Sequence, residues 1–152
     1  MLYSLPSSGI QVVVNDAMRS KNGLVRRRTI LLVEDALTTR CILEQFFARA
    51  GCDVLQAADP DTAFLRLKTS DVDAVILDLR LGSRSGLEVL EQIRLEDRYA
   101  HLPVVILTGV LQVEPAEEEI IQRHGAHLLY KHYGYREVVG RLEQIIKTKI
   151  AA

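Results

Sequence analysis

The stretch DAVILDL, residues 73–79, decides the fold of this chain. It holds a run of aliphatic residues between two aspartates, and branched side chains such as Val75 and Ile76 favour a strand over a helix. No polar residue alternates with the aliphatic ones, which is typical of a strand that is buried on both faces. Such strands belong to parallel sheets covered by helices, in which functional residues lie at the carboxyl ends of the strands. Asp78 occupies that end.

The rest of the chain repeats this pattern of apolar runs separated by amphipathic segments. Further runs predict strands at residues 29–34, 53–57, 103–109 and 126–130. The segments around them predict helices at 38–51, 60–69, 85–94, from Pro115 onward and at 135–149. Strands that alternate with helices predict an α/β domain with a five-stranded parallel sheet and helices on both faces.

Composition and charge exclude several classes of protein. The length of 152 residues suits one domain with a sizeable core. The net charge is −1, and the short basic cluster at 26–28 is expected to be a solvated linker, so direct binding to nucleic acid is not expected. No apolar run approaches the ~18 residues that cross a bilayer, which predicts no membrane insertion. Cys41 and Cys52 form no CxxC pair and predict reduced thiols in a cytoplasmic protein.

Charged or reactive residues stand at the ends of four predicted strands. They are Glu34 and Asp35 after the first strand, Asp78 after the third, Thr108 and Gly109 after the fourth, and Lys131 after the fifth. Because the carboxyl ends of parallel strands share one edge of the sheet, three carboxylates are expected to crowd into one shallow pocket. Two unit charges ~4 Å apart repel by about 4 kcal/mol at an effective dielectric constant of 20. The three carboxylates are therefore expected to be stable together only if their ionisation is suppressed or if cations bind at this edge.

Lys131 supplies one cation, and a hard divalent ion, Mg²⁺ or Mn²⁺, is expected to supply the other. Mg²⁺ takes one or two carboxylates and keeps several waters, which leaves space for a phosphoryl oxygen. The pocket is thus equipped for phosphoryl transfer to Asp78 as the nucleophile. The Thr108 hydroxyl and the Lys131 ammonium would bind phosphoryl oxygens, and Gly109 would leave them room.

In four stretches the sequence resembles the receiver domain of bacterial two-component response regulators. These are ILLVEDALTTR (30–40), VILDLRLGSRSGLEVL (75–90), PVVILTG (103–109) and GAHLLYK (125–131), within a similarity that covers about residues 28–149. The resemblance implies a flavodoxin-like, doubly wound (βα)5 fold with the strand order 2-1-3-4-5. It also implies a receiver domain over 28–150 and no recognisable output domain. Residues 1–27 are rich in Ser, Gly and Asn and predict a flexible extension.

The resemblance implies a role for each residue that matches the family motifs. Glu34 and Asp35 would be the acidic pair that binds the metal, together with Asp78, the phosphorylated aspartate. The backbone carbonyl of Arg80 would be a further metal ligand. The side chains of Arg80 and Val110 would flank the phosphate and influence the rate of dephosphorylation.

Three departures from the family pattern concern the surroundings of the site. Gly82 stands where the family usually has proline, and glycine is expected to make that turn less rigidly. Leu128 replaces the aromatic residue that usually acts with Thr108 as the output switch, and Tyr130 is expected to face differently because strand side chains alternate. His132 replaces the cis-proline that usually follows the lysine. A cis bond before a non-proline residue costs ~3–4 kcal/mol, so the bond before His132 is predicted to be trans.

The implied function is that of a phospho-accepting receiver, in which Mg²⁺-dependent phosphorylation of Asp78 controls the binding of a partner. The phosphate donor would be a sensor histidine kinase or a phosphotransfer protein, and the downstream partner would be a protein. A homodimer through the fourth helix, the fifth strand and the last helix is a further expectation. Such a receiver is a signalling domain rather than an enzyme, with at most self-catalysed phosphoryl transfer and autodephosphorylation.

Two alternatives remain open. The first is a receiver-like interaction module that works without phosphorylation, which the altered fifth strand favours. The second is a phosphatase of related topology with an aspartate nucleophile, similar to haloacid dehalogenases. Those enzymes commonly need a second acid two residues after the nucleophile, where this chain has Arg80.

Overall fold

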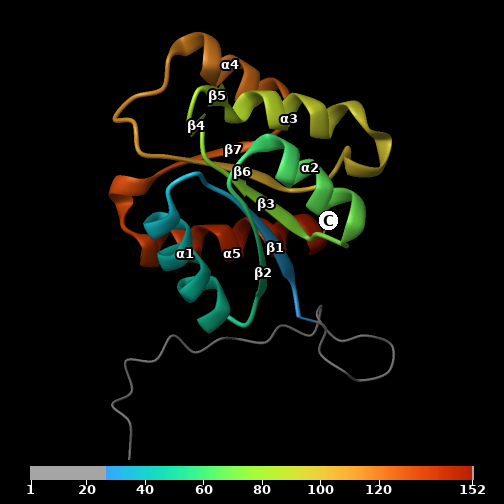
Figure 1. The fold of residues 1–152 in the computed structure, drawn as a ribbon, viewed down its shortest axis with the longest axis vertical. Coiled ribbons are helices and arrows are strands. Elements are labelled where there is room, and N and C mark those ends of the chain that lie inside the picture. The colour runs from blue at the N-terminus through green and yellow to red at the C-terminus, as the bar shows by residue number, and fades with distance from the viewer. Residues whose placement is uncertain (1–26, 152) are drawn as a thin grey trace, which may run out of the picture.

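A parallel sheet of five strands forms the centre of the computed structural model, which describes residues 27–151 and the side chains of 27–147 (Figure 1). The strands are β1 (Thr29–Val33), β2 (Asp53–Ala57), β3 (Ala74–Leu77), β6 (Val104–Thr108) and β7 (His127–Tyr130). Their order in space is β2-β1-β3-β6-β7. The predicted order 2-1-3-4-5 is therefore confirmed, since β4 and β5 lie outside this sheet. Residues 1–26 of the predicted extension lie outside the described residues.

Helices cover both faces of the sheet, as predicted. They are α1 (Leu37–Arg49), α2 (Pro60–Thr69), α3 (Gly86–Leu95), α4 (Pro115–Arg123) and α5 (Tyr135–Ala151). Helices α1 and α5 pack on one face, and α2, α3 and α4 pack on the other (Figure 1). Successive strand residues serve opposite faces: Leu31 of β1 lies in the cluster under α2–α4, and Leu32 lies in the cluster under α1 and α5. None of the described helices is both long and apolar enough to cross a membrane.

Two helices begin at the signals that the sequence offers. The Asp59 side chain accepts a hydrogen bond from the Thr62 N–H at 2.8 Å, so it caps α2 one residue before Pro60. At the start of α4, the Glu117 carboxylate accepts a 3.3 Å hydrogen bond from the Glu114 N–H. The acidic run that predicted a helix N-terminus is therefore the first turn of α4.

A short antiparallel hairpin after β3 is absent from the sequence-based prediction. Its strands are β4 (Arg80–Leu81) and β5 (Arg84–Ser85). Gly82 lies in the turn with a φ of 62°. Proline has φ fixed near about −65°, so it cannot adopt this conformation. Gly82 therefore makes a different turn from the family's proline, and not a looser version of the same one.

Tyr130 faces the same side of the sheet as Leu128, so the prediction that it faces differently is wrong. Both side chains pack against the cluster under α2–α4, whereas Leu129 belongs to the opposite cluster. The reason is that side chains alternate with a period of two, which puts residues two apart on one face.

The basic cluster before β1 is not simply a solvated linker. Arg28 is only 6% exposed. Its carbonyl oxygen accepts a 2.8 Å hydrogen bond from the Asp53 N–H, which extends the pairing of β1 with β2 by one residue. Arg27 remains exposed and pairs with the Asp53 carboxylate at 2.8 Å.

The chain after Lys131 follows the unusual path that the sequence predicts. The described residues contain no cis peptide bond, so the bond before His132 is trans. The 3₁₀ turn η3 (Lys131–Tyr133) follows, and the chain leaves it through Gly134 with a φ of 90°. The rings of Tyr130, His132 and Tyr133 pack together, with centroids 4.9 to 5.8 Å apart. Aromatic contacts thus stabilise the turn that replaces the cis-proline.

Candidate functional site

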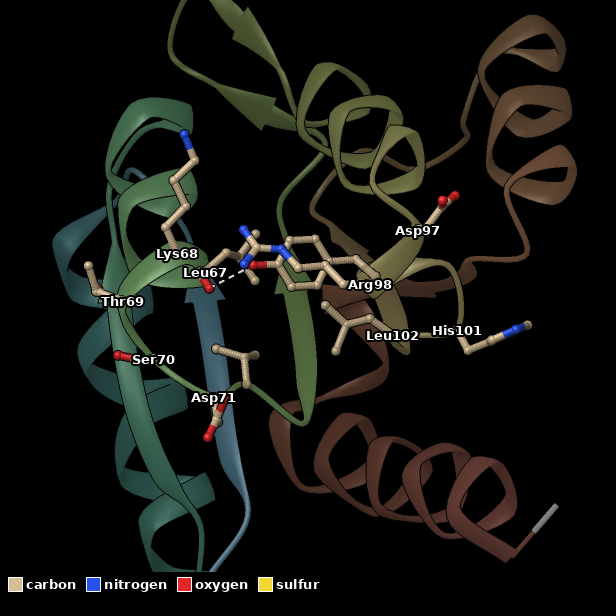
Figure 2. A pocket seen from close by; sticks show the side chains of 11 residues that line it. Leu67, Lys68, Thr69, Ser70, Asp71, Asp97, Arg98, His101 and Leu102 are labelled. Atoms are coloured by element: carbon tan, nitrogen blue, oxygen red, sulfur yellow. Dashed lines mark hydrogen bonds between the residues drawn. The ribbon is translucent and has the colours of Figure 1, made fainter.

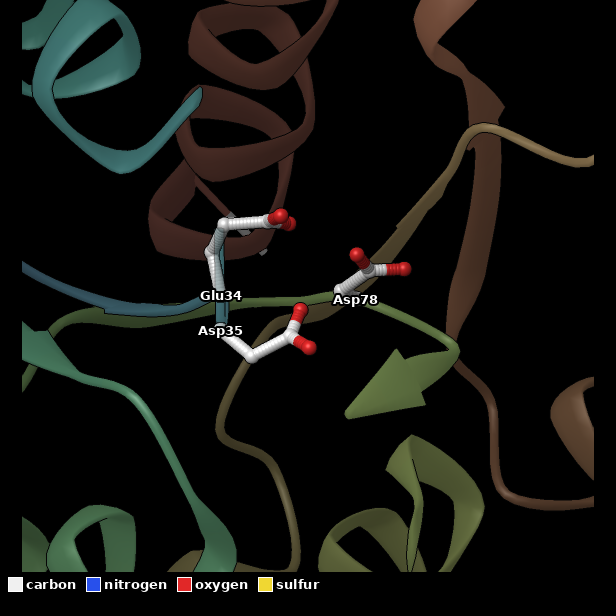
Figure 3. Close-up of side chains that lie close together, drawn as sticks. All are labelled: Glu34, Asp35 and Asp78. Carbon is white, nitrogen blue, oxygen red and sulfur yellow. The ribbon is translucent and has the colours of Figure 1, made fainter. Parts of the chain in front are cut away.

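Three carboxylates converge at the carboxyl edge of the sheet (Figure 3). Val33 of β1 is paired with Leu77 of β3, so the residues that follow, Glu34 and Asp78, leave the sheet side by side. Asp35 comes directly after Glu34. An oxygen from each of these three carboxylates lies within 4.8 Å of the other two. The predicted crowding is confirmed; Glu34 and Asp78 are buried, and Asp35 is exposed.

The ammonium of Lys131 bridges two of these carboxylates. Its Nζ lies 2.9 Å from Glu34 Oε2 and 2.9 Å from Asp78 Oδ2. The lysine side chain runs past Gly109, where an added Cβ would lie 3.6 Å from Lys131 Cδ. Lys131 is therefore the cation of this edge, as predicted, and even an added Cβ at position 109 would only make an ordinary van der Waals contact with its side chain.

Burial and charge set the protonation of this edge. Burial raises the pKa of Glu34 to about 7; its hydrogen bond to Asp78 and the Asp78 charge add to this effect, and Lys131 opposes it. Burial by itself lowers the pKa of Lys131. The hydrogen bonds and charges of Glu34 and Asp78 outweigh this and raise the pKa of Lys131 above its usual value. Lys131 thus stays charged at neutral pH, while Glu34 exchanges a proton there.

Glu34 is expected to make the stability of the metal-free protein depend on pH. Its pKa of about 7 lies above the ordinary 4.5, so between these pH values the folded state holds a proton that the unfolded state has released. The stabilisation is complete below the unfolded pKa and is lost as the pH rises through the folded pKa, by on the order of 2 kcal/mol. Urea unfolding in EDTA at several pH values between about 5 and 8 measures this loss. The Glu34→Gln variant should lack it, and an unchanged pH dependence in that variant would contradict the assignment.

The donor set of this edge fits a hard divalent cation. All three groups are carboxylates, and within residues 27–147 Lys131 is the only side-chain cation that bonds to their oxygens. One ammonium does not neutralise the cluster once Glu34 has released its proton, and oxygen ligands are those that Mg²⁺ prefers. The Gly82 N–H donates to Asp35 Oδ2 at 3.0 Å and holds this exposed carboxylate against the hairpin.

Thr108 lies at the predicted edge, and its hydroxyl bonds to the backbone of its own loop. It ends β6, the strand next to β3, and its side chain is fully buried. Its hydroxyl accepts a 3.3 Å hydrogen bond from the N–H of the half-buried Val110. Within the part of the chain that the structure describes, no hydrogen bond joins the Thr108 hydroxyl to Glu34, Asp35 or Asp78. Its contact with a phosphoryl oxygen stays a prediction.

The side chain of Arg80 points away from the carboxylates. Its backbone N–H donates to Asp78 Oδ1 at 3.1 Å. Its guanidinium instead pairs with Glu117 of α4, at 2.5 Å to Oε1 and 3.1 Å to Oε2. These hydrogen bonds hold the pKa of Glu117 below its usual value. Sequence reasoning missed this partner, because no local pattern joins residues from two such distant elements.

Two further residues that sequence reasoning missed hold the backbone of the site. An added Cβ at Gly86 would lie 2.0 Å from the carbonyl oxygen of Asp78, and the Gly86 N–H donates to the Leu79 carbonyl at 2.8 Å. Arg40 of α1 donates from Nη1 to the Glu34 carbonyl at 2.7 Å. Both residues lie inside the stretches that carry the family resemblance, so the signal was present in the sequence.

A cavity of about 560 Å³ lies at the opposite edge of the sheet (Figure 2). The end of α2 and the 3₁₀ turn η2 (Asp97–Tyr99) line it, just before β3 and β6 begin. The Tyr99 hydroxyl donates to the Leu67 carbonyl at 2.7 Å across it. None of the three clustered carboxylates lines this cavity, so its volume is separate from the candidate site.

Comparison with known proteins points to one family. A sequence model of the response regulator receiver domain matches residues 30–143. The chain is 33% identical over 100 residues to chemotaxis protein CheY-3 of Vibrio cholerae. This match covers 65% of the present chain and 74% of CheY-3. It is 32% identical over 99 residues to protein-glutamate methylesterase/protein-glutamine glutaminase 1 of Anaeromyxobacter dehalogenans. That match covers 64% of this chain and only 27% of the methylesterase.

Solved structures agree with these sequence matches. The crystal structure of a putative response regulator from Chloroflexus aurantiacus superposes with a TM-score of 0.71 at 27% identity. The superposition covers 80% of this chain and 99% of the other. The superposition thus includes nearly the whole chain of that response regulator.

Proposed function

The chain belongs to the family of response regulator receiver domains, and on this basis we propose that Asp78 accepts a phosphoryl group in a reaction that depends on Mg²⁺. Receiver domains act in signalling rather than as enzymes, and a phospho-accepting role fits this chain. One observation carries the assignment to Asp78: its carboxylate lies in a cluster of three, and Lys131 Nζ bonds to it at 2.9 Å.

The same cluster would hold the metal. Receiver domains bind Mg²⁺ at acidic residues, and we assign this role here to Glu34, Asp35 and Asp78, with the backbone carbonyl of Arg80 as a further ligand. Mn²⁺ suits the same oxygen donors. When bound, the ion offsets the repulsion between an anionic nucleophile and an anionic phosphoryl group.

Each remaining residue of the edge has a role in the transfer. An oxygen of Asp78 attacks phosphorus, and an acyl phosphate forms as the bond to the donor's leaving group breaks. Lys131 would bind a phosphoryl oxygen, because its ammonium already lies beside the attacked carboxylate. The Thr108 hydroxyl would bind another, and the small Gly109 would leave space for the group. Val110 and Arg80 would flank it and set its rate of hydrolysis.

Phosphoryl uptake is expected to require the divalent ion. Incubated with acetyl phosphate and Mg²⁺, the chain should gain the mass of one phosphoryl group. With EDTA in place of Mg²⁺ the gain should disappear, since the uncompensated carboxylates repel the phosphodonor. Intact-mass analysis of the two samples measures both results. An equal gain in EDTA would contradict the role of the metal, and no gain in either sample would contradict the proposed function.

The partners follow from the family. Receiver domains interact with histidine kinases or phosphotransfer proteins and with downstream effectors. For this chain we propose a sensor histidine kinase or a phosphotransfer protein as the donor, and a protein that recognises α4, β7 and α5. Leu128 and Tyr130 support this surface as the output switch, since both pack on the α4 side of the sheet. A homodimer would use the same surface.

An interaction module that works without phosphorylation is the second candidate. The aromatic turn of Tyr130, His132 and Tyr133 favours it, because this turn rebuilds the surface directly after Lys131. Failure to take up a phosphoryl group together with retained partner binding would support it. A phosphatase fits poorly, because Arg80 stands where the second acid would be needed and its guanidinium is paired with Glu117.

A further inference from the structure

We propose that Glu117 is a positioning residue of the phosphorylation site. Glu117 forms an ion pair with the guanidinium of Arg80 while Asp78 is a free carboxylate. This ion pair breaks when Asp78 carries a phosphoryl group. The inference rests on the proposed phosphorylation of Asp78. The Arg80–Glu117 ion pair would then connect the site with the first turn of α4, and phosphorylation would break this connection.

The ion pair has the geometry of a specific contact. Nη1 and Nη2 of Arg80 lie 2.5 Å and 3.1 Å from the two carboxylate oxygens of Glu117, which is the paired arrangement that guanidinium and carboxylate favour. The Glu117 side chain is 19% exposed, and that of Arg80 is 49% exposed. Glu117 Oε2 also accepts the Glu114 N–H at 3.3 Å. Glu117 is therefore the fixed end of the pair, and Arg80 is the end with freedom to move.

Arg80 is also attached to the phosphoacceptor. Its backbone N–H lies 3.1 Å from Asp78 Oδ1, so its side chain begins beside the position of the phosphoryl group. A phosphoryl group brings about two negative charges and three acceptor oxygens, and guanidinium pairs with phosphate in the same forked geometry as with carboxylate. Glu117 occupies the edge of the guanidinium that carries Nη1 and Nη2, so a forked pair from this edge to the phosphoryl group requires the release of Glu117. Because the phosphoryl group carries the larger negative charge, the guanidinium of Arg80 pairs with it and no longer with Glu117.

The coupling must be reciprocal. If a phosphoryl group weakens the pair between Arg80 and Glu117, then the loss of that pair strengthens the binding of a phosphoryl group. Breaking the pair also frees the first turn of α4 from the hairpin that carries Arg80. The N-terminal hydrogen bond to Glu114 can remain, so α4 stays a helix while its attachment changes.

The binding of beryllofluoride with Mg²⁺, a phosphoryl analogue, tests the reciprocal effect. Glutamine at position 117 can still accept the capping hydrogen bond but carries no charge for Arg80. Exposed ion pairs have modest strength, so Glu117→Gln is expected to bind beryllofluoride about 2- to 5-fold more tightly than wild type. Glu118→Gln is the matched control, since it removes the same charge from the same turn of the exposed helix face. Its affinity should equal that of wild type.

A double-mutant cycle separates this role from a merely structural one. In an Arg80→Gln background, Glu117→Gln should leave the affinity for beryllofluoride unchanged. Amide hydrogen exchange in the first turn of α4 should rise in wild type when beryllofluoride binds. In Glu117→Gln it should already be raised without the analogue and change no further.

The outcomes distinguish the inference from the function on which it rests. If wild type does not bind beryllofluoride, the proposed function and the inference are both overturned. If wild type binds it but Glu117→Gln behaves like Glu118→Gln, the positioning role alone is overturned. The same holds if Glu117→Gln tightens binding equally without Arg80, because the effect would then be a general one of charge.

Discussion

Replacement of Asp78 by asparagine is expected to abolish phosphoryl uptake. Wild type in acetyl phosphate and Mg²⁺ should gain one phosphoryl group, and Asp78→Asn should gain none. The amide has nearly the shape of the carboxylate but is not a nucleophile for phosphorus and is a poorer ligand for a hard cation. The loss should be complete within the detection limit of intact-mass analysis. Asp78 is the carboxylate of the cluster that bonds to Lys131 and also follows β3, the strand paired with β6, so the other two carboxylates are not expected to replace it as the acceptor.

Asp71→Asn is the matched control for this result. Asp71 is exposed and lines the cavity at the opposite edge of the sheet. The control should take up the phosphoryl group as wild type does. Thermal unfolding of both variants checks that the difference does not arise from misfolding. Uptake by Asp78→Asn at the wild-type level would place the phosphoacceptor elsewhere and would remove the basis of the proposed function.

Replacement of Gly86 by alanine is expected to cause the largest loss of stability. The added Cβ would lie 2.0 Å from the carbonyl oxygen of Asp78 and 3.2 Å from the Cα of Leu79. Both are backbone atoms, which cannot rotate out of the way. The start of α3 must therefore move away from the phosphoacceptor loop, and the free energy of unfolding should fall by on the order of 3 kcal/mol. Urea unfolding measures this change.

Gly140→Ala provides a control of opposite sign. Gly140 lies within α5, and no atom lies within 4 Å of the position of its added Cβ. Alanine in a helix interior is favoured over glycine, so this variant should be more stable than wild type by roughly 0.5–1 kcal/mol. If Gly86→Ala were as stable as Gly140→Ala, the close contact between α3 and Asp78 would not exist in solution.

Most of the fold was predictable because its signals are local. Four of the sheet strands are mainly apolar runs, β2 is a weaker one that contains Asp53 and Gln56, and each predicted helix lies within a few residues of the observed one. The hairpin of β4 and β5 was missed because strands of two residues carry no periodicity. Tyr130 was misplaced by a wrong use of the alternation rule, and the correct count from Leu128 gives the observed face.

The candidate site was predictable to the level of its residues but not of its contacts. Chain order placed Glu34, Asp78 and Lys131 at strand ends, and the parallel topology brought these ends to one edge. Nothing in their spacing indicated that one ammonium would bridge two carboxylates at 2.9 Å each. Gly86 and Arg40 were visible in the family motifs, yet their roles depend on backbone atoms that only the folded chain brings near.

The sequence by itself therefore determined the strands, the helices, their alternation and the identity of the residues at the strand ends. These properties depend on neighbours a few positions apart, whose periodicity and chemistry can be read along the chain. Only the tertiary structure decided that burial raises the pKa of Glu34 to about 7 and that Arg80 bonds to Glu117 and not to its neighbours in the loop. Such properties depend on desolvation and on distances between elements remote in sequence, which packing sets and which local patterns do not record.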